Sequence, residues 1–319
     1  MAQVVAVTLT AATFAFVALH LAPGDAANAL TEGASPAMRA HLRQSFGLDQ
    51  QLSTQFARWF LALLRGDLGM SLTEQRPVTA LLAEALPATV LLVVPAFLLS
   101  ALLGMLVGVW QATWRGRRRD RWTDGILLVV YSVPEFWLAM TLALLFARHW
   151  HVLPANGMSG DMAAYLPASA RIVDRLRHLV MPVLSLTLVG VATFARYQRG
   201  SMIDALAQPF VQTARAAGVP RWRVFLLTWR VAALPVVTLA GLLLPAWLAG
   251  VVFVEQVFAW PGVGTLLLRA VINRDYAVVS GAVIVGSALT ASVAAVAEGV
   301  RGLVDPRVRA DAPRSAGST

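Results

Sequence analysis

The chain has 319 residues, of which 58% are hydrophobic and 13% are charged, whereas a typical soluble domain has about 25% charged residues. All 26 basic residues are arginines, because the sequence contains no lysine and no cysteine, and the net charge is +9. The missing lysine excludes a P-loop and any Schiff base. The missing cysteine excludes disulfides, thiolate nucleophiles and cysteine-ligated zinc.

Six apolar stretches are long enough to cross a membrane as helices, which takes about 20 mostly apolar residues. Six such stretches in a soluble protein would need an unrealistically large core. The sequence therefore predicts an all-α integral membrane protein with six transmembrane helices. Gly104 and Gly108 form a GxxxG pattern in the second stretch, which permits close helix packing. The predicted spans are 2–21, 88–114, 125–147, 178–195, 233–253 and 278–297.

The placement of arginine predicts how these spans are oriented. Five arginines lie within 115–121, six within 196–230 and four after residue 300. Six spans put all of them on one side, which we expect to be the cytoplasm, together with both termini. The first span begins without a basic flank, so a signal peptide or a start codon placed too far downstream are alternatives there.

The outer segment 22–86 is too long for a tight loop, and its pattern predicts short amphipathic helices. Three such helices are expected to start near Ser35, Ser53 and Pro77, the second with aromatic residues at helical spacing from Phe56 onward. We expect a small folded cap on the outer membrane face, and a mobile loop is the alternative.

The second outer segment, 148–177, contains His149 and His151, a spacing that can bind metal. The two histidines flank Trp150 at a membrane boundary, and no carboxylate is adjacent. An interfacial polar role is therefore favoured, and no metal site is predicted.

The cytoplasmic segment 196–232 is rich in helix-forming residues. Helices are predicted over Ala205–Ala217 and Arg221–Ala233, separated by the breaker Gly218-Val219-Pro220. Because spans tether both ends of this element, a DNA-binding role is disfavoured. Two alternatives remain, a basic element on the lipid surface and an element that inserts into a groove on a partner protein.

The stretch FVQTARAAGVPRWRVFLLTWRVAALPVVT (210–238) resembles the coupling loop of permease subunits of ATP-binding-cassette (ABC) importers, in particular the dipeptide/oligopeptide/nickel permease family. Further fragments that match this family in order cover nearly the whole chain. They include LAPGDAANAL (21–30), SVPEFW (132–137), FAWPGVG (258–264), NRDY (273–276) and LVDPRVR (303–309).

The resemblance implies the type I ABC importer permease fold in a bacterial inner membrane, as a multi-pass protein. It implies a second homologous permease, two ATP-binding subunits and a periplasmic or lipid-anchored solute-binding protein as partners. ATP and magnesium would belong to the ATP-binding subunits, and this chain would bind membrane lipids but no cofactor and no nucleic acid. The expected domains are a transmembrane helix at 1–21, a periplasmic helical cap at 22–86, a permease core at 87–300 with its coupling loop at 196–232, and a cytoplasmic tail at 301–319.

In this family the coupling element docks in a cleft of the ATPase subunit and transmits its closure to the spans. The general pattern is Glu-Ala-Ala followed by a glycine; here Gln212 stands in place of the glutamate. The arginines of the loop are suited to an acidic groove rim, although positive-inside orientation alone would also explain them. The predicted ATPase-coupling residues are Gln212, Thr213, Ala214, Arg215, Gly218, Arg221, Arg223 and Arg230.

Two carboxylates, Glu135 and Glu255, lie within or at the end of apolar stretches, where ionisable groups normally face a bundle interior or an aqueous path. The family usually has a neutral residue at Glu135, so this glutamate is a candidate for favouring cationic or amine-bearing substrates. Hydrogen bonding to a neighbouring helix is the alternative, as is a cap or partner contact for Glu255. We assign Glu135, Trp137 and Glu255 to the translocation path, and Trp260 and Tyr276 to interface anchoring.

The expected function is therefore the permease subunit of an ATP-driven importer that forms, with a sister permease, a path for peptides. Import of nickel or a metal chelate is the alternative within the family. A stand-alone secondary transporter would show internal repeats, which the sequence lacks. An intramembrane enzyme would need a nucleophile–base or metal constellation. No catalytic residue is predicted, and ATP hydrolysis is expected on the partner subunits.

Overall fold

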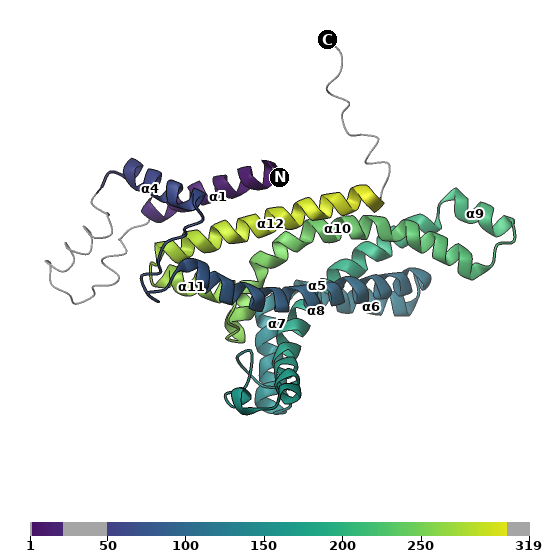
Figure 1. Ribbon diagram of the computed structural model, residues 1–319. Helices are drawn as coiled ribbons and strands as arrows, with labels where there is room; N and C mark the ends of the chain where they lie inside the picture. Colours follow the sequence, from purple (N-terminus) through teal and green to yellow (C-terminus); the bar gives the residue numbers. More distant parts are fainter. Residues whose placement is uncertain (1, 22–49, 305–319) are drawn as a thin grey trace, which may run out of the picture. The chain divides into compact units, whose positions relative to one another are not determined.

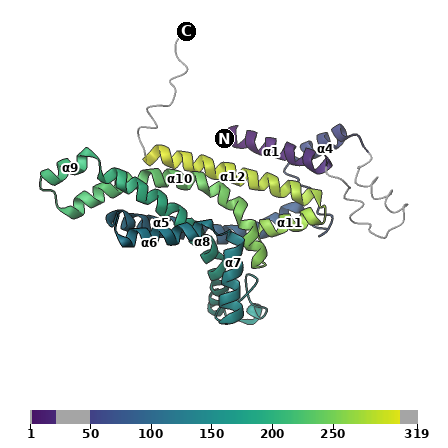
Figure 2. The same ribbon diagram turned by 180° about the vertical axis from the view of Figure 1, so that it is seen from behind.

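The computed structural model describes residues 2–21 and 50–304, and the chain divides into two compact units. Unit 1 comprises Met1–Val90 with Ala259–Ser292, and unit 2 comprises Leu91–Phe258 with Val293–Thr319. The described residues are helices and the segments that connect them, with one isolated bridge between Met70 and Pro77. Figures 1 and 2 show these helices from two sides. The all-α prediction is confirmed for this part of the chain.

Among the described residues, four helices contain a stretch long and apolar enough to cross a membrane, and a bent pair of shorter helices counts as a fifth if it forms one span. The first predicted span forms α1 (Ala2–Leu21), but its apolar part, Val4–Leu19, is shorter than these four. The predicted number of six spans is therefore not confirmed. The four long helices are α5 (Val78–Thr113), α8 (Ala168–Leu206), α10 (Arg221–Val257) and α12 (Tyr276–Val304).

Helix α5 begins earlier than predicted and passes through Pro87 without a break. We predicted a separate helix from Pro77 to about Glu84, followed by a new span after Pro87, and this division is wrong. A proline in a helix interior removes one backbone hydrogen bond and costs about 3 kcal/mol. Leu82 and Ala88, buried on either side of the proline, supply packing that opposes this cost.

The third predicted span is broken in its middle. Helix α6 (Arg118–Ser132) and helix α7 (Glu135–Leu142), which continues as a wider turn over Ala143–His149, are bent by 99° relative to each other. Val133 has extended backbone angles because a residue before proline avoids the helical region, and Pro134 has no N–H to continue the helix. Glu135 therefore opens a helix and does not lie in the middle of a straight span.

The core of unit 2 contains the contact between α5 and α8, which the GxxxG pattern makes possible. A Cβ atom on Gly104 would lie 2.5 Å from the Cβ of Phe194, and one on Gly108 would lie 2.5 Å from the carbonyl oxygen of Ala195. Only glycine permits the two backbones to approach this closely, so the predicted close packing is confirmed. Phe97 extends the contact with its ring edge-on to that of Phe194, at 5.7 Å between centroids.

In unit 1, helix α4 (Leu52–Leu64) confirms the second of the helices predicted for the outer segment. Its start differs, because Gln51 is the N-cap and Ser53 lies inside the helix. Phe56 and Trp59 pack on Phe16 of α1, with ring centroids 5.2 and 5.0 Å away. The helix expected near Ser35 lies outside the described residues, and the predicted cap at 22–86 stays a prediction.

Buried hydrogen bonds connect distant segments of unit 1. The Ser71 hydroxyl donates to Asp275 Oδ2 at 2.6 Å, and the other oxygen of Asp275 accepts from the first turn of α12. Trp260 donates its indole N–H to the carbonyl of Ala88 at 2.8 Å, and Thr89 accepts from the backbone at the start of α11 (Val263–Ile272). Trp260 has no exposed surface, so its predicted role as an interface anchor is wrong.

Candidate coupling site

The predicted helix–turn–helix is present in unit 2, where a short helix projects beyond the ends of α8 and α10 (Figures 1 and 2). Its first helix, α9 (Pro209–Ala216), is shorter than the predicted Ala205–Ala217, because α8 continues to Leu206 and proline opens α9 at its first position. Its second helix does not end at Ala233 but continues without a break as α10.

Backbone hydrogen bonds fix the turn between α9 and α10. Gly218 has a φ of +71°, and its N–H donates to the carbonyl of Arg215 at 3.1 Å, while Val219 N–H donates to that of Ala214 at 3.0 Å. This pair of bonds is the Schellman arrangement that ends many helices. Pro220 then precedes the first residue of α10, as predicted. A Cβ on Gly218 would meet no atom within 4 Å, so this turn requires glycine for its backbone angles.

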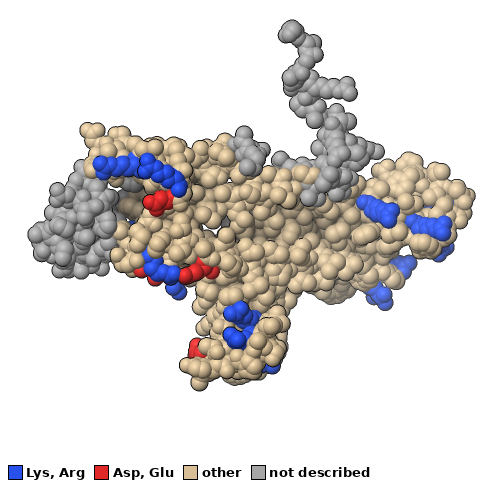
Figure 3. Space-filling view, viewed as in Figure 1, with Lys and Arg blue, Asp and Glu red and all other residues tan. Residues whose placement is uncertain are grey.

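The polar side chains of the site lie at the surface of unit 2. Arg215, Arg221, Arg223 and Arg230 are exposed, and none forms an ion pair with a carboxylate of residues 2–21 or 50–304. Figure 3 shows arginine, and no acidic side chain, on the visible face at this end of unit 2. Gln212 and Thr213 are also exposed and Ala214 is half-buried. The site is therefore a positively charged surface whose charge is not neutralised within the described chain.

Few side chains hold this element against the helix bundle. Val211 of α9 and Val224 of α10 are buried. Between the turn and the ends of α5 and α8 lies a cavity of about 790 Å³, bordered by Ala112, Leu206 and Val219 and also by Arg215 and Arg221. Because this cavity lies beneath the turn, the α9–α10 turn can shift without disrupting a closely packed core.

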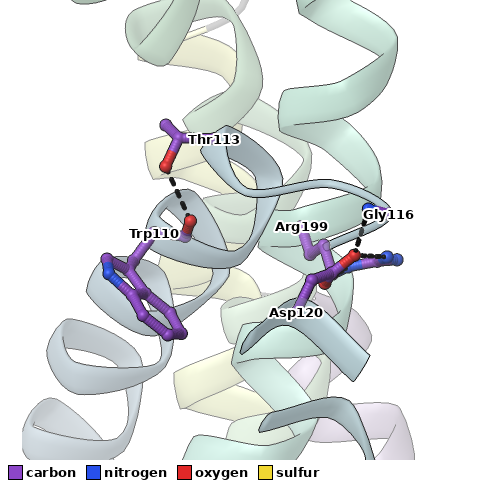
Figure 4. Close-up of polar contacts among 5 residues, drawn as sticks. All are labelled: Trp110, Thr113, Gly116, Asp120 and Arg199. Atoms are coloured by element: carbon purple, nitrogen blue, oxygen red, sulfur yellow. Dashed lines mark hydrogen bonds and ion pairs between the residues drawn. The ribbon is translucent and has the colours of Figure 1, made fainter. Parts of the chain in front are cut away.

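An ion pair next to this site holds the loop between α5 and α6 to α8 (Figure 4). Arg199 donates from Nε and from one terminal nitrogen to the two oxygens of Asp120, both at 2.8 Å, and the Gly116 N–H donates to Asp120 Oδ2 at 2.9 Å. Asp120 is 2% exposed. Sequence reasoning missed this pair; the available signal was a single acid within the arginine-rich segment 115–121.

Two fully buried amides lie in the same region, Gln111 on α5 and Gln198 on α8. Their side-chain oxygen and nitrogen atoms have no hydrogen-bond partner among the residues that the structure describes. Unsatisfied buried amides are unfavourable. The contact between α5 and α8 in this region includes the close approach at Gly108, where an added Cβ would lie 2.7 Å from the Cβ of Gln198.

The three residues assigned to the translocation path have different surroundings. Glu135 lies against α10, where a Cβ on Gly250 would be 3.2 Å from its Oε2. Trp137 is 53% exposed, whereas Glu255 has no exposed surface. The structure brings the start of α7 to the second half of α10, but it does not place the three side chains on one common surface.

Within the described ranges, no group of three or more His, Cys, Asp or Glu residues is arranged to hold a metal ion. His149 lies beside Trp150, with ring centroids 6.5 Å apart, and both side chains are exposed.

Comparison with known proteins places this chain in a family. The family described as "binding-protein-dependent transport system inner membrane component" matches residues 101–310, which is more than half of the chain. The chain belongs to this family. This inner membrane component is thus a multi-pass permease subunit, and the matched residues include the Asp120–Arg199 pair, α9 and all of α10.

Individual relatives of this inner membrane component match over nearly its whole length. A dipeptide transport system permease protein of Escherichia coli (strain K12) is 33% identical over 320 aligned residues, which cover 94% of each chain. A probable D,D-dipeptide transport system permease protein of the same strain is 35% identical, over 92% of this chain and 91% of the relative. A putative peptide transport system permease protein of Brucella abortus (strain 2308) is 33% identical over 97% of both. The predicted family and permease role are confirmed.

Proposed function

We propose that the chain is the permease subunit of an ATP-driven importer for peptides, and that it forms the translocation path with a second, homologous permease. The substrate class is supported by the similarity to dipeptide and peptide permeases over more than nine tenths of the chain. The family description supports dependence on a solute-binding protein. Because the chain has no lysine, it has no P-loop, and we propose that two partner subunits bind and hydrolyse ATP.

We further propose that the α9–α10 turn, residues 115–121 and both termini face the cytoplasm. The enrichment of arginine in these segments supports this orientation, because cytoplasmic loops carry an excess of basic residues. The segments 22–86 and 148–177 are then periplasmic.

The exposed, unneutralised surface of the α9–α10 turn is the observation that carries the coupling role. We propose that α9 inserts into a groove on the ATP-binding subunit and that Arg215, Arg221, Arg223 and Arg230 meet its acidic rim. Gln212, Thr213 and Ala214 would line the contact on α9, and Gly218 sets the direction in which the chain enters α10. Movement of the ATP-binding subunit then reaches the membrane directly, because α10 is continuous with the turn.

Replacing Gly218 tests this role. We expect Gly218→Pro to abolish uptake of a radiolabelled dipeptide by the assembled importer, because proline cannot adopt a positive φ and lacks the N–H that donates to Arg215. Gly218→Asn is the matched control; it tolerates this backbone conformation and should retain most of the uptake. Immunoblots of washed membranes should show equal amounts of both variants. Normal uptake by the inserted proline variant would contradict the coupling role.

We also propose that Glu135 and Trp137 line the path and that Glu135 attracts the amino group of a peptide. Glu255 would join the path only in a state that separates the helices now covering it. We expect Glu135→Gln to raise the dipeptide concentration needed for half-maximal uptake, whereas the exposed Asp161→Asn control should not. Unchanged affinity, rate and substrate range in Glu135→Gln would count against this assignment.

A further inference from the structure

Helix α6 has two chemically different faces. Asp120 and Leu127 are buried against α8, where Asp120 is bound by Arg199 and Leu127 packs with Ala192. At 100° per residue, positions 118 and 125 lie roughly opposite Asp120 on the helix. Asp120 is therefore neutralised inside unit 2, while the arginines of the opposite face point outward.

This opposite face forms an open groove of about 860 Å³, within the range of roughly 300–1,000 Å³ that is common for ligand sites. Its polarity changes along the helix, from guanidinium groups at the first turn to aliphatic side chains three turns later. We call it the α6 groove. It is lined by Arg118, Arg121, Trp122, Gly125, Ile126, Val129 and Val130.

The arginines of the groove differ from their neighbours in having no partner. The guanidinium groups of Arg118 and Arg121 form no ion pair, hydrogen bond or aromatic contact within the described part of the chain. Arg117 and Arg119, by contrast, lie over the ring of Trp114, at 4.8 and 4.9 Å from its centroid. Two guanidinium groups at the end of the groove are therefore available to an external anion.

The middle of the groove is kept open by a glycine. A Cβ on Gly125 would meet no atom within 4 Å, so neither backbone strain nor a close helix contact accounts for glycine in this helix interior, where it lowers stability. Trp122 is 74% exposed beside it, and Ile126 and Val129 are at least 60% exposed. The space beside Gly125 continues into this apolar part of the groove.

We propose that the α6 groove binds an anionic phospholipid. Arg118 and Arg121 hold the phosphate, because the guanidinium group donates paired hydrogen bonds to phosphate oxygens. Trp122 lies at headgroup depth, where tryptophan is enriched in membrane proteins, and an acyl chain passes over Gly125 along Ile126 and Val129. A phospholipid carries an anion and an apolar chain in the same order as the groove, whereas a soluble anion would use the arginines alone.

This site goes beyond the proposed transport role and does not depend on the identity of the transported substrate. The same turn of α6 carries Asp120 on its inner face. The first turn of α6 would therefore be fixed on two sides, by a bound phospholipid on its outer face and by the Asp120–Arg199 pair on its inner face.

Native mass spectrometry of the full-length chain in detergent tests the proposal, with phosphatidylglycerol and phosphatidylcholine of identical acyl chains as probes. We expect Arg118→Gln/Arg121→Gln to weaken phosphatidylglycerol binding roughly tenfold or more. Each basic residue near an anionic lipid raises the affinity by about fivefold. Gly125→Leu should cause a similar loss while keeping both charges, since its side chain fills the groove. Arg117→Gln/Arg119→Gln removes the same charge and should change binding by less than about twofold.

Four results would overturn the proposal. Equal weakening by the Arg117/Arg119 control would show that only the summed charge matters, and equally tight binding of phosphatidylcholine would show no preference for an anion. Displacement of the lipid by glycerol phosphate at the same concentration as by phosphatidylglycerol would reduce the site to an anion site. Loss of the sister permease from the purified importer, with phosphatidylglycerol binding intact in both groove variants, would show that the surface is a subunit interface.

Discussion

The two arginine-rich segments of unit 2, residues 115–121 and the α9–α10 turn, use their charges differently. In the first, the acidic Asp120 is bound by Arg199 of α8, and two guanidinium groups lie over Trp114. In the second, the exposed arginines have no carboxylate partner in the described chain, and only Arg223 lies over an aromatic ring, that of Trp222.

The difference separates charges that are paired within the fold from charges that stay unpaired in the described chain and that we propose for a partner subunit. Both segments are rich in arginine, and the orientation that we propose puts both in the cytoplasm, so counting arginines does not tell them apart. The two segments are distinguished by the buried Asp120 carboxylate, which only the 115–121 segment contains. A buried carboxylate needs its charged partner for stability. Stability should therefore respond to substitutions around Asp120, and transport should respond to substitutions in the α9–α10 turn.

The largest effect is expected from Arg199→Ala, which leaves the Asp120 carboxylate buried without its partner. We expect a loss of about 2–4 kcal/mol, or roughly 5–10 °C in the midpoint of thermal unfolding in detergent. Arg230→Ala, on α10 after the turn, is the control and should leave the midpoint nearly unchanged, because this arginine is exposed and has no carboxylate partner among the described residues. The double variant Asp120→Asn/Arg199→Ala should recover part of the loss. Equal midpoints for the Arg199 and Arg230 variants would abolish the distinction between the segments.

A smaller effect, on transport alone, is expected from Arg215→Gln/Arg221→Gln. Uptake should fall roughly five- to tenfold at physiological ionic strength, because charges at the rim of an interface mainly guide association. The unfolding midpoint should stay the same. Arg171→Gln/Arg175→Gln, at the start of α8, is the matched control and should transport normally. The comparison would fail if the Arg215/Arg221 variant lowered the midpoint and left uptake unchanged.

The smallest effect is expected from Trp114→Leu, which removes the ring beneath Arg117 and Arg119. Cation–π contacts at partly exposed sites contribute about 0.5–1 kcal/mol, so the midpoint should fall by roughly 1–4 °C. Trp222→Leu, with one arginine over its ring, should lower it less. A fall as large as that of Arg199→Ala would mean that Trp114, and not Asp120, organises the 115–121 segment.

Features that depend on local backbone chemistry were predictable from the sequence. The break at Gly218-Val219-Pro220 was expected because a positive φ favours glycine and because proline suits a helix start. The close packing at Gly104 and Gly108 was likewise expected from their spacing. Both signals are contained within a few neighbouring residues.

Features that depend on which distant segments meet were not predictable. Nothing local distinguishes Arg199 from the other arginines as the partner of Asp120, which lies 79 positions away along the chain. Trp260 was expected at the membrane interface, but the carbonyl of Ala88 accepts from its indole inside unit 1. Pro87 and Pro134 carry the same local signal, yet α5 continues through the first and the chain bends sharply at the second.

The continuity of α10 has a mechanical consequence. Its 37 residues from Arg221 to Val257 correspond to about 55 Å of helix, and no connecting loop separates the α9–α10 turn from the far end. Tilting such a rod by roughly 10° about one end displaces the other by close to 10 Å, which is about the diameter of a helix. A small rotation imposed at Arg221 therefore becomes a large displacement near Glu255, unless bending at Pro235 absorbs part of it.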